Sequence, residues 1–221
     1  MTLDPILRQN LFIAGTDTAV GKTWVATRLL MALGASGLRV AGMKPVAAGA
    51  TLTPAGLRNE DALALAQAGN VALAYETLNP YCLAAATSPH IAARYEAISI
   101  DIAIIMHRFS QIVGKTDIVV VEGAGGWMAP IGDPLYPGTP GPTMADVAQK
   151  LGLPVLLVVG MRLGCISHAL LTADAIRTQG LQLAGWIANP IDPDFLPASA
   201  GYAEYVEALE QRLPAPRLQV Y

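Results

Sequence analysis

A glycine-rich segment that ends in lysine and threonine carries the clearest chemical signal in this sequence. It reads Gly-Thr-Asp-Thr-Ala-Val-Gly-Lys-Thr over residues 15–23, with an apolar run before it and a helical pattern after it. Backbone N–H groups at the start of a helix attract phosphate oxygens, and Gly21 allows a close approach because it has no Cβ. Lys22 adds positive charge at the terminal phosphates, and the Thr23 hydroxyl can ligate Mg²⁺. The segment therefore predicts a nucleoside triphosphate site, although five residues separate Gly15 from Gly-Lys-Thr where four are usual.

Three charged residues elsewhere fit the same chemistry. Lys44 lies near the end of an expected strand at 39–46, so its ammonium group should project over the crevice that holds Lys22. Two such groups suit a reaction whose transition state carries several negative charges. Glu122 ends an apolar run and precedes Gly-Ala-Gly-Gly, which favours a Mg²⁺ ligand because the ion on ATP takes one or two protein carboxylates. Asp61 opens an expected helix, and from spacing alone a helix-dipole role is the simpler interpretation.

Other reactive side chains carry weaker signals. Residues 164–167 read Gly-Cys-Ile-Ser at an expected strand-to-helix junction, and either a second anion site or an ordinary turn fits them. Cys165 has no base beside it in the sequence, which argues against a nucleophile. The histidines lack metal-ligand spacing and are interpreted as surface or core residues: His90, His107 and His168.

Alternating strands and helices must position these residues. Continuous apolar runs predict buried strands, and apolar residues three or four apart predict helices. The expected strands cover residues 11–15, 39–46, 118–121, 155–159 and 183–188. The expected helices cover residues 22–33, 61–68, 99–113, 144–151, 165–178 and 202–213, and the proline-rich segment 133–142 is expected to be a loop. The helix at 99–113 is apolar nearly all round, which predicts burial on more than one side.

This alternation predicts an α/β fold of the P-loop NTPase type, with a mainly parallel sheet and helices on both faces. A single domain over residues 1–221 accounts for the length of the chain. In such sheets ligands bind beyond the carboxyl ends of the strands. Each of the motifs described above lies at such an end, and their agreement is stronger evidence than any one of them.

Composition excludes several classes of function. The chain has 14 basic and 17 acidic residues, a net charge of −3 and no basic cluster, which excludes non-specific nucleic-acid binding. The most apolar run, 153–161, is far shorter than the roughly 20 residues that span a bilayer. Residues 1–10 lack the apolar core of a signal peptide, and Cys82 and Cys165 cannot form a disulfide framework. We therefore expect a cytoplasmic protein with small-molecule substrates and no nucleic-acid or membrane partner.

Taken together, these segments resemble the dethiobiotin synthase family from about residue 11 to residue 213. Several of them are more specific than a phosphate loop alone. They are Gly-Thr-Asp-Thr-Ala-Val-Gly-Lys-Thr (15–23), Gly-Met-Lys-Pro-Val-Ala-Ala-Gly (42–49), Leu-Arg-Asn-Glu-Asp-Ala-Leu (57–63), Asn-Pro-Tyr (79–81), Thr-Ser-Pro-His (87–90), Val-Glu-Gly-Ala-Gly-Gly-Trp (121–127), Val-Val-Gly-Met-Arg-Leu-Gly-Cys-Ile-Ser-His-Ala (158–169) and Ala-Gly-Trp-Ile-Ala-Asn (184–189).

The resemblance implies an enzyme that closes a ureido ring on 7,8-diaminononanoate with CO₂, ATP and Mg²⁺, and no organic cofactor. It implies catalytic roles for Lys44, Lys22 and Thr18, and a metal set of Thr23, Asp61 and Glu122. The residues implied to bind the nucleotide and its metal are Ala19, Val20, Gly21, Lys22, Thr23, Trp24, Asp61, Glu122, Gly123, Ala124, Gly125 and Asn189. A homodimer is also implied, in which the substrate contacts Lys44 of one chain and, on the other chain, Gly164, Cys165, Ile166, Ser167 and Tyr205.

The sequence departs from the family pattern at four positions and near its end. Ala19 stands where some relatives have Glu, Ala48 where some have Ser, Arg162 where Lys is familiar, and Ser167 where Asn is frequent. Relatives often continue past the Pro-Ala-Pro segment at 214–216 and cover the nucleotide base, so nucleotide selectivity stays open.

Three alternatives compete with this family interpretation. The first is a switch ATPase of the partitioning or septum-placement type, but those proteins carry an additional lysine early in the loop and residues 16–20 have none. The second is an amide-forming ligase of the cobyrinate class, which normally needs a glutaminase domain. The third is a nucleotide-binding protein without catalysis, against which Lys22, Lys44 and Glu122 argue.

Overall fold

Five parallel strands form the central sheet of the computed structural model, which describes residues 3–134, 136, 138–195, 197 and 200–220. The strand order is β2-β7-β1-β8-β9, and every neighbouring pair is parallel. The strands are β1 (Leu11–Gly15), β2 (Val40–Met43), β7 (Ile118–Glu122), β8 (Val155–Met161) and β9 (Leu183–Pro190). All residues of β1, β2, β7 and β8 are buried, which confirms the predicted sheet covered on both faces.

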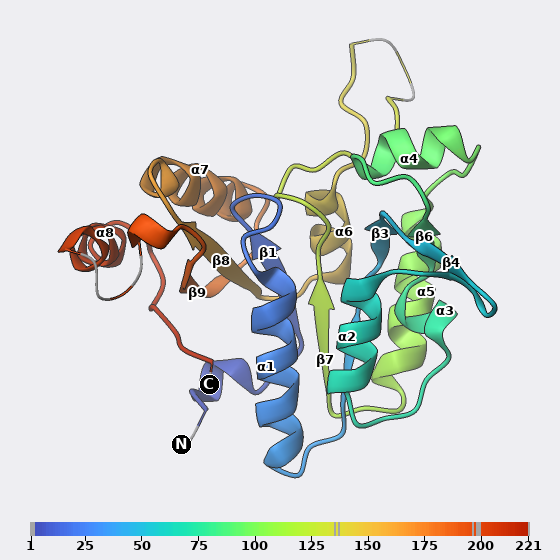
Figure 1. The fold of residues 1–221 in the computed structure, drawn as a ribbon, viewed down its shortest axis with the longest axis horizontal. Helices are drawn as coiled ribbons and strands as arrows, with labels where there is room; N and C mark the ends of the chain where they lie inside the picture. Colours follow the sequence, from blue (N-terminus) through green and yellow to red (C-terminus); the bar gives the residue numbers. More distant parts are fainter. Residues whose placement is uncertain (1–2, 135, 137, 196, 198–199, 221) are drawn as a thin grey trace.

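Helices cover the two faces of this sheet, as Figure 1 shows. On one face α1 (Lys22–Ala35) and α2 (Glu60–Ala68) contribute Leu29 and Leu65 to a core cluster with alternate strand residues such as Val120. The other face packs against α5 (Ile102–Val113), α6 (Met144–Leu151), α7 (Cys165–Thr178) and α8 (Ala200–Glu210). Among the described residues, no helix has both the length and the apolar character of a membrane span.

Several short strands and helices come after β2 in the chain. Strand β3 (Val46–Ala48) pairs in parallel with β6 (Tyr81–Leu83), and β4 (Thr51–Thr53) forms an antiparallel hairpin with β5 (Gly56–Arg58). Two short helices, α3 (Tyr75–Leu78) and α4 (Pro89–Tyr95), and two 3-10 turns, Pro5–Leu7 and Pro193–Phe195, complete the described elements. Strands β4, β5 and β6 were not predicted from the sequence, because three residues are too few to show a period.

The strand expected at 39–46 is two strands with an interruption between them. Strand β2 ends at Met43 and β3 begins at Val46. Pro45 has no N–H with which to continue the ladder, and the Lys44 N–H donates instead to the Leu78 carbonyl at 2.8 Å. Lys44 therefore lies just beyond β2, at the side of the sheet where the carboxyl ends of β1 and β7 also lie.

The prediction that the helix at 99–113 is buried on more than one side was wrong. The helix begins at Ile102, and it buries Ile105 and Ile112 completely while Ile104 is 44% exposed. Exposed apolar residues are common on protein surfaces, so composition alone did not indicate which face was covered. The other predicted helices and strands are present, with differences confined to their ends.

Candidate active site

The segment between β1 and α1 has the backbone of a phosphate-binding loop. Gly21 is the N-cap of α1 with a φ of 89°, and a Cβ on it would lie 2.1 Å from Asn189 Nδ2. That amide donates to the Val20 carbonyl at 2.8 Å, so β9 holds the loop from one side. The Lys22 ammonium donates to the Asp17 carbonyl at 2.9 Å across the loop. The loop is thereby closed around the start of α1, where the first helical N–H groups can meet an anion.

The loop lysine occupies a position that suits a bound anion. Lys22 is 6% exposed, and burial together with the nearby Lys44 ammonium lowers the pKa of Lys22 to about 8. A phosphate chain in the loop would supply the negative charge that favours the protonated lysine. The burial and charge of Lys22 are therefore compatible with a phosphate site, which stays a prediction.

Lys44 lies between two carboxylates. Its Nζ is 2.5 Å from Glu122 Oε1 and 3.1 Å from Asp61 Oδ2. Lys44 is 5% exposed and Glu122 is 0% exposed. Burial alone would lower the pKa of Lys44, but the charges of Glu122 and Asp61 raise this pKa above its ordinary value. The structure thus brings together three residues that the sequence predicted to share a site, and the lysine among them is charged.

Oxygen atoms in this cluster fit a Mg²⁺ ion. The Thr23 hydroxyl donates to Glu122 Oε1 at 2.9 Å, and Glu122 Oε2 is buried with no hydrogen-bond partner among the described residues. A buried acceptor without a partner is unfavourable unless a donor or cation binds it. Mg²⁺ prefers oxygen ligands and takes one or two carboxylates together with phosphate oxygens. Within the described ranges, no group of three or more His, Cys, Asp or Glu side chains is placed to hold a metal.

A cavity of about 530 Å³ opens beside Lys44. Its walls combine small apolar side chains with hydroxyl, amide and charged groups. They are Thr18, Lys44, Ala47, Ala48, Asn59, Asp61, Ala86, Thr87, Ser88, Pro89, Ala124, Gly125, Gly126, Ala129 and Pro130. Such a lining suits a ligand with both aliphatic and polar parts. Thr18, to which the resemblance assigned a catalytic role, lies in the same cavity as Lys44.

A second cavity, of about 220 Å³, lies beside the start of α1. It is lined by Trp24, Ile187, Ala188, Asn189, Pro190, Tyr202, Arg217, Leu218, Gln219 and Val220. The end of the chain runs along β9, since the Leu218 N–H donates to the Trp186 carbonyl at 2.8 Å. Residues 217–220 therefore form a wall of a cavity that Asn189 and Trp24 also line.

The turn before α7 contacts the phosphate loop through an ion pair. Asp17 accepts a hydrogen bond from the Thr18 N–H at 2.7 Å, and Arg162 Nη2 lies 2.5 Å from Asp17 Oδ2. The Thr18 hydrogen bond and the Arg162 charge lower the pKa of Asp17. The sequence analysis treated Arg162 only as a replacement for lysine and missed this contact, because residues so far apart in the chain give no local signal of pairing.

The residues expected to bind the substrate from a second chain lie apart from the Lys44 cavity. Helix α7 begins at Cys165 with Gly164 as its N-cap, so residues 164–167 form the predicted junction. Tyr205 lies on α8, and its ring packs edge-on against the Phe195 ring, with 4.8 Å between the ring centroids. Neither group lines the cavity beside Lys44, and Figure 1 shows α7 between α8 and the β3–α4 side of the molecule. Within the described part of one chain, residues 164–167 and Tyr205 are therefore not part of the lining of the Lys44 cavity.

The two cysteines are free thiols. Burial raises the pKa of Cys82 and of Cys165, which disfavours the nucleophilic thiolate. The free thiols agree with the prediction that neither cysteine belongs to a disulfide framework.

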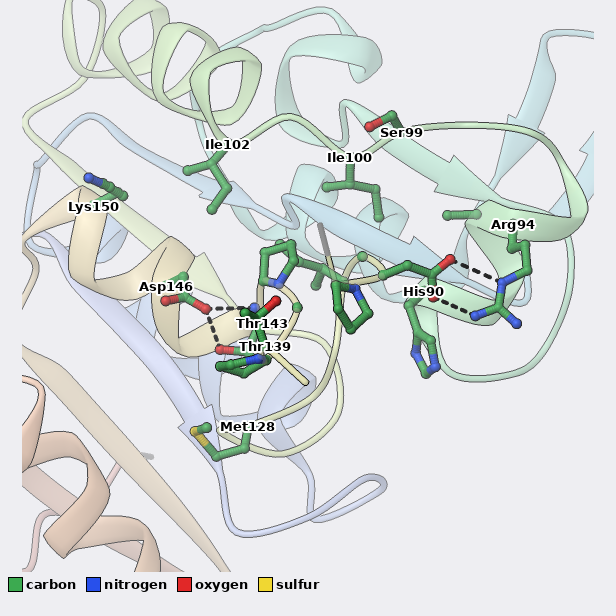
Figure 2. A pocket seen from close by; sticks show the side chains of 18 of the residues that line it. His90, Arg94, Ser99, Ile100, Ile102, Met128, Thr139, Thr143, Asp146 and Lys150 are labelled. Carbon is green, nitrogen blue, oxygen red and sulfur yellow. Dashed lines mark hydrogen bonds and ion pairs between the residues drawn. The ribbon is translucent and has the colours of Figure 1, made fainter. Parts of the chain in front are cut away.

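The segment 133–142 lies over a larger cavity of about 1060 Å³, shown in Figure 2. Within its described part the segment contains no helix or strand, as predicted, while residues 135 and 137 lie outside the described residues. Asp133 forms an ion pair with Arg94 of α4, and both the N–H and the hydroxyl of Thr143 donate to Asp146 at 2.7 Å. The segment is thus anchored near both ends, and its cavity has none of Lys22, Lys44 or Glu122 in its lining.

The loop after β1, with a lysine and a threonine in the first turn of the helix that follows, places the chain in the P-loop nucleotide-binding class. A family model described as an AAA domain matches residues 9–219. In the MinC:MinD cell division protein complex of Aquifex aeolicus, a similar chain has a TM-score of 0.54 and 17% identity, covering 95% of this chain and 79% of that one. At this identity the likeness concerns the fold alone.

Relatives of higher identity share one name. The ATP-dependent dethiobiotin synthetase of Vibrio vulnificus (strain YJ016) is 48% identical over 212 residues, which are 96% of this chain and 88% of that protein. The ATP-dependent dethiobiotin synthetase of Aromatoleum aromaticum is 51% identical over 209 residues, which are 95% of this chain and 88% of that protein. The chain therefore belongs to the ATP-dependent dethiobiotin synthetase family, as its motifs indicated.

Several residues of the cavity beside Lys44 had no predicted role. Asn59, Thr87 and Ser88 line this cavity. They lie within the segments Leu-Arg-Asn-Glu-Asp-Ala-Leu and Thr-Ser-Pro-His, which carried part of the resemblance. These segments lie far from the phosphate loop in the sequence, so no local pattern indicates that they meet it at one site. The only signal for their role was that they resemble segments of the same family.

Proposed function

We propose that this chain catalyses the ATP-dependent closure of a ureido ring on 7,8-diaminononanoate, which gives dethiobiotin, ADP and phosphate. The observation that carries the proposal is the buried Lys44 ammonium, held by Glu122 at 2.5 Å and Asp61 at 3.1 Å, at the wall of a cavity that also contains Thr18. In a member of this family, a fixed cation at that position suits a substrate that becomes an anion during the reaction.

The proposed chemistry has three steps. One substrate amine takes up CO₂ and loses a proton to form a carbamate. A carbamate oxygen then attacks the γ-phosphorus of ATP, the bond from this phosphorus to the β-phosphate oxygen breaks, and ADP leaves. The neighbouring amine attacks the carbonyl carbon of the phosphorylated carbamate, loses a proton, and expels phosphate as the ring closes.

In this scheme the protein supplies position and charge. Lys44 faces the carbamate and the transferring phosphoryl group, and Lys22 contacts the terminal phosphates from the loop. Thr18 lies beside the carbamate in the same cavity. The alanine and proline side chains of the cavity pack against the aliphatic chain of the substrate. Holding the two reacting groups together in this way removes much of the entropic barrier to their reaction.

Thr23, Asp61 and Glu122 would hold Mg²⁺, which when bound would neutralise charge on the β- and γ-phosphates. The oxygens proposed as its ligands include those that contact Lys44 in this structure. Lys44 therefore serves as the counter-ion of both carboxylates, and Glu122 Oε2, which has no hydrogen-bond partner among the described residues, would remain available to the ion. On the nucleotide side, Asn189 and Trp24 line the cavity proposed to receive the base.

The function is tested by incubating the purified protein with 7,8-diaminononanoate, bicarbonate, Mg²⁺ and ATP. We expect dethiobiotin by mass spectrometry, with one ADP formed for each ring closed and no product when any component is left out. ATP hydrolysis that does not depend on the diamine, without dethiobiotin, would instead favour the switch ATPase.

We also propose that the active enzyme is a homodimer and that each substrate site uses two chains. Support comes from the separation of residues 164–167 and Tyr205 from the Lys44 cavity of their own chain. The surface around α7 also exposes apolar side chains, with Leu163 77% and Leu171 68% exposed. A self-associating surface would cover such residues.

Mixing two inactive variants tests this arrangement. Lys44→Gln and Tyr205→Ala each remove one half of the proposed site, so we expect each variant alone to be impaired. Equal mixing with subunit exchange should restore about one quarter of the wild-type activity, because half of the dimers are mixed and each mixed dimer has one intact site. Native mass spectrometry checks that mixed dimers form. If they form and no activity returns, the site does not span two chains.

A further inference from the structure

Behind the cluster of Lys44, Asp61 and Glu122, a buried asparagine is bonded to the backbone of Lys44. Asn79 caps the end of α3 and is 2% exposed. Its Nδ2 donates to the Lys44 carbonyl at 2.7 Å and to the Tyr81 carbonyl at 3.2 Å. The Lys44 N–H donates to the carbonyl of Leu78, the last residue of α3. Both sides of the Lys44 backbone are therefore held by the end of this short helix.

The hydroxyl of Tyr75 extends these bonds to the helix that carries Asp61. It donates to Asn79 Oδ1 at 2.9 Å and accepts from the Asn59 N–H at 2.8 Å. Asn59 is the N-cap of α2, and its side chain accepts from the Ala62 N–H at 3.2 Å. Asp61 lies in the first turn of α2, so this cap holds the backbone from which its carboxylate projects.

The surroundings of Tyr75 hold its ring and hydroxyl in place. The Arg58 guanidinium lies over the Tyr75 ring at 4.1 Å and pairs with Glu76 at 3.3 Å. The Cys82 thiol lies 3.5 Å from the hydroxyl oxygen. Burial raises the pKa of Tyr75 to about 12, so the hydroxyl keeps the proton that it donates to Asn79.

We propose that Tyr75 and Asn79 are positioning residues, which set the distance between Lys44 and Asp61 by joining the Lys44 backbone to the N-cap of α2. The two charged side chains come from different elements, and their 3.1 Å contact depends on how β2 and α2 are held relative to each other. The link to catalysis rests on the proposed function, because it assigns the reaction to Lys44 and the metal to Asp61.

Tyr75→Phe tests the inference, since it removes the hydroxyl and keeps the ring. Loss of a hydrogen bond that orients a reactive group from behind typically costs roughly 10–100-fold in activity. We therefore expect kcat for dethiobiotin formation to fall by that factor. The KM for ATP should stay nearly unchanged, because the phosphate loop is not bonded to Tyr75 in the described structure.

The chain offers a matched control in Tyr81→Phe. The Tyr81 hydroxyl accepts from the Asp101 N–H at 2.8 Å and donates to the Asp101 carbonyl at 3.3 Å. It therefore supports the N-cap of α5, as Tyr75 supports that of α2. Both variants lose one partly or fully buried hydroxyl, so we expect similar decreases in Tm, but the loss of kcat should occur in Tyr75→Phe alone.

Amide hydrogen exchange provides a readout that does not depend on the reaction. In Tyr75→Phe we expect faster exchange at Lys44 and Ala62, while Tyr81→Phe leaves both amides as in the wild type. Unchanged exchange at both amides in Tyr75→Phe would overturn the proposal, and so would an equal loss of kcat in the two variants. If the wild-type protein makes no dethiobiotin, the proposed function fails, and the exchange data alone decide whether Tyr75 holds the two segments in place.

Discussion

Lys44→Gln is expected to abolish ring closure and to leave nucleotide binding largely intact. The glutamine side chain can still donate a hydrogen bond, but it carries no charge towards the carbamate or the transferring phosphoryl group. Removing one preorganised donor from a developing anion costs roughly 10²–10³-fold in kcat, and the loss of a full charge should be at least as large. Product formation measured by mass gives kcat, and calorimetry with ADP gives nucleotide affinity.

Lys115→Gln is the matched control for this variant. Lys115 is exposed in the turn before β7, at the opposite end of that strand from Glu122. The net charge changes equally in both variants, so activity should stay at the wild-type level in the control. Stability must be measured in parallel, because Glu122 loses a buried partner in Lys44→Gln, and breaking such a pair costs roughly 3–5 kcal/mol. Unchanged turnover in a folded Lys44→Gln protein would refute the catalytic role.

The central sheet could be predicted from the sequence because its strands are uniformly apolar. Residues 118–121 read Ile-Val-Val-Val, and all of β7 is buried, so one pattern specified both the strand and its place inside the protein. The bounds of α6 and α7 agree with the prediction as well, since glycine or proline lies close to their ends. Short strands and the exposed face of α5 were missed because local patterns do not report what packs against them.

The candidate site likewise has one part that could be predicted from the sequence and another that could not. Residues 15–23 are contiguous, and their chemistry could be read without knowing the fold. Lys44 follows β2 and Glu122 ends the neighbouring strand β7, so the parallel topology was enough to predict that they meet. In contrast, Asp17 pairs with Arg162, and Tyr75 joins Asn59 to Asn79, through contacts that depend on tertiary packing. Such contacts leave no local pattern in the sequence.

Glu122→Gln is expected to raise the Mg²⁺ requirement sharply and to lower kcat. A neutral amide oxygen is a weaker ligand than a carboxylate, and the amide NH₂ cannot accept a hydrogen bond from the Lys44 ammonium, which lies 2.5 Å from Glu122 Oε1. Lys44 would retain Asp61 as its charged partner, so its ammonium should shift towards Asp61 on α2. We expect the Mg²⁺ concentration for half-maximal turnover to rise by at least roughly tenfold, as measured by metal titration at saturating ATP.

Asp117→Asn separates this effect from a general loss of negative charge. Asp117 immediately precedes β7, and its carboxylate pairs with Arg39 at 2.7 Å on the surface, at the other end of the strand from Glu122. Both substitutions neutralise one acidic residue beside the same strand, yet only Glu122→Gln alters the proposed metal site. Electron paramagnetic resonance with Mn²⁺ should show weaker binding in Glu122→Gln and wild-type binding in Asp117→Asn. An unaltered metal titration in a folded Glu122→Gln protein would remove Glu122 from the ligand set, and the buried carboxylate would then serve only to hold Lys44 in its charged form.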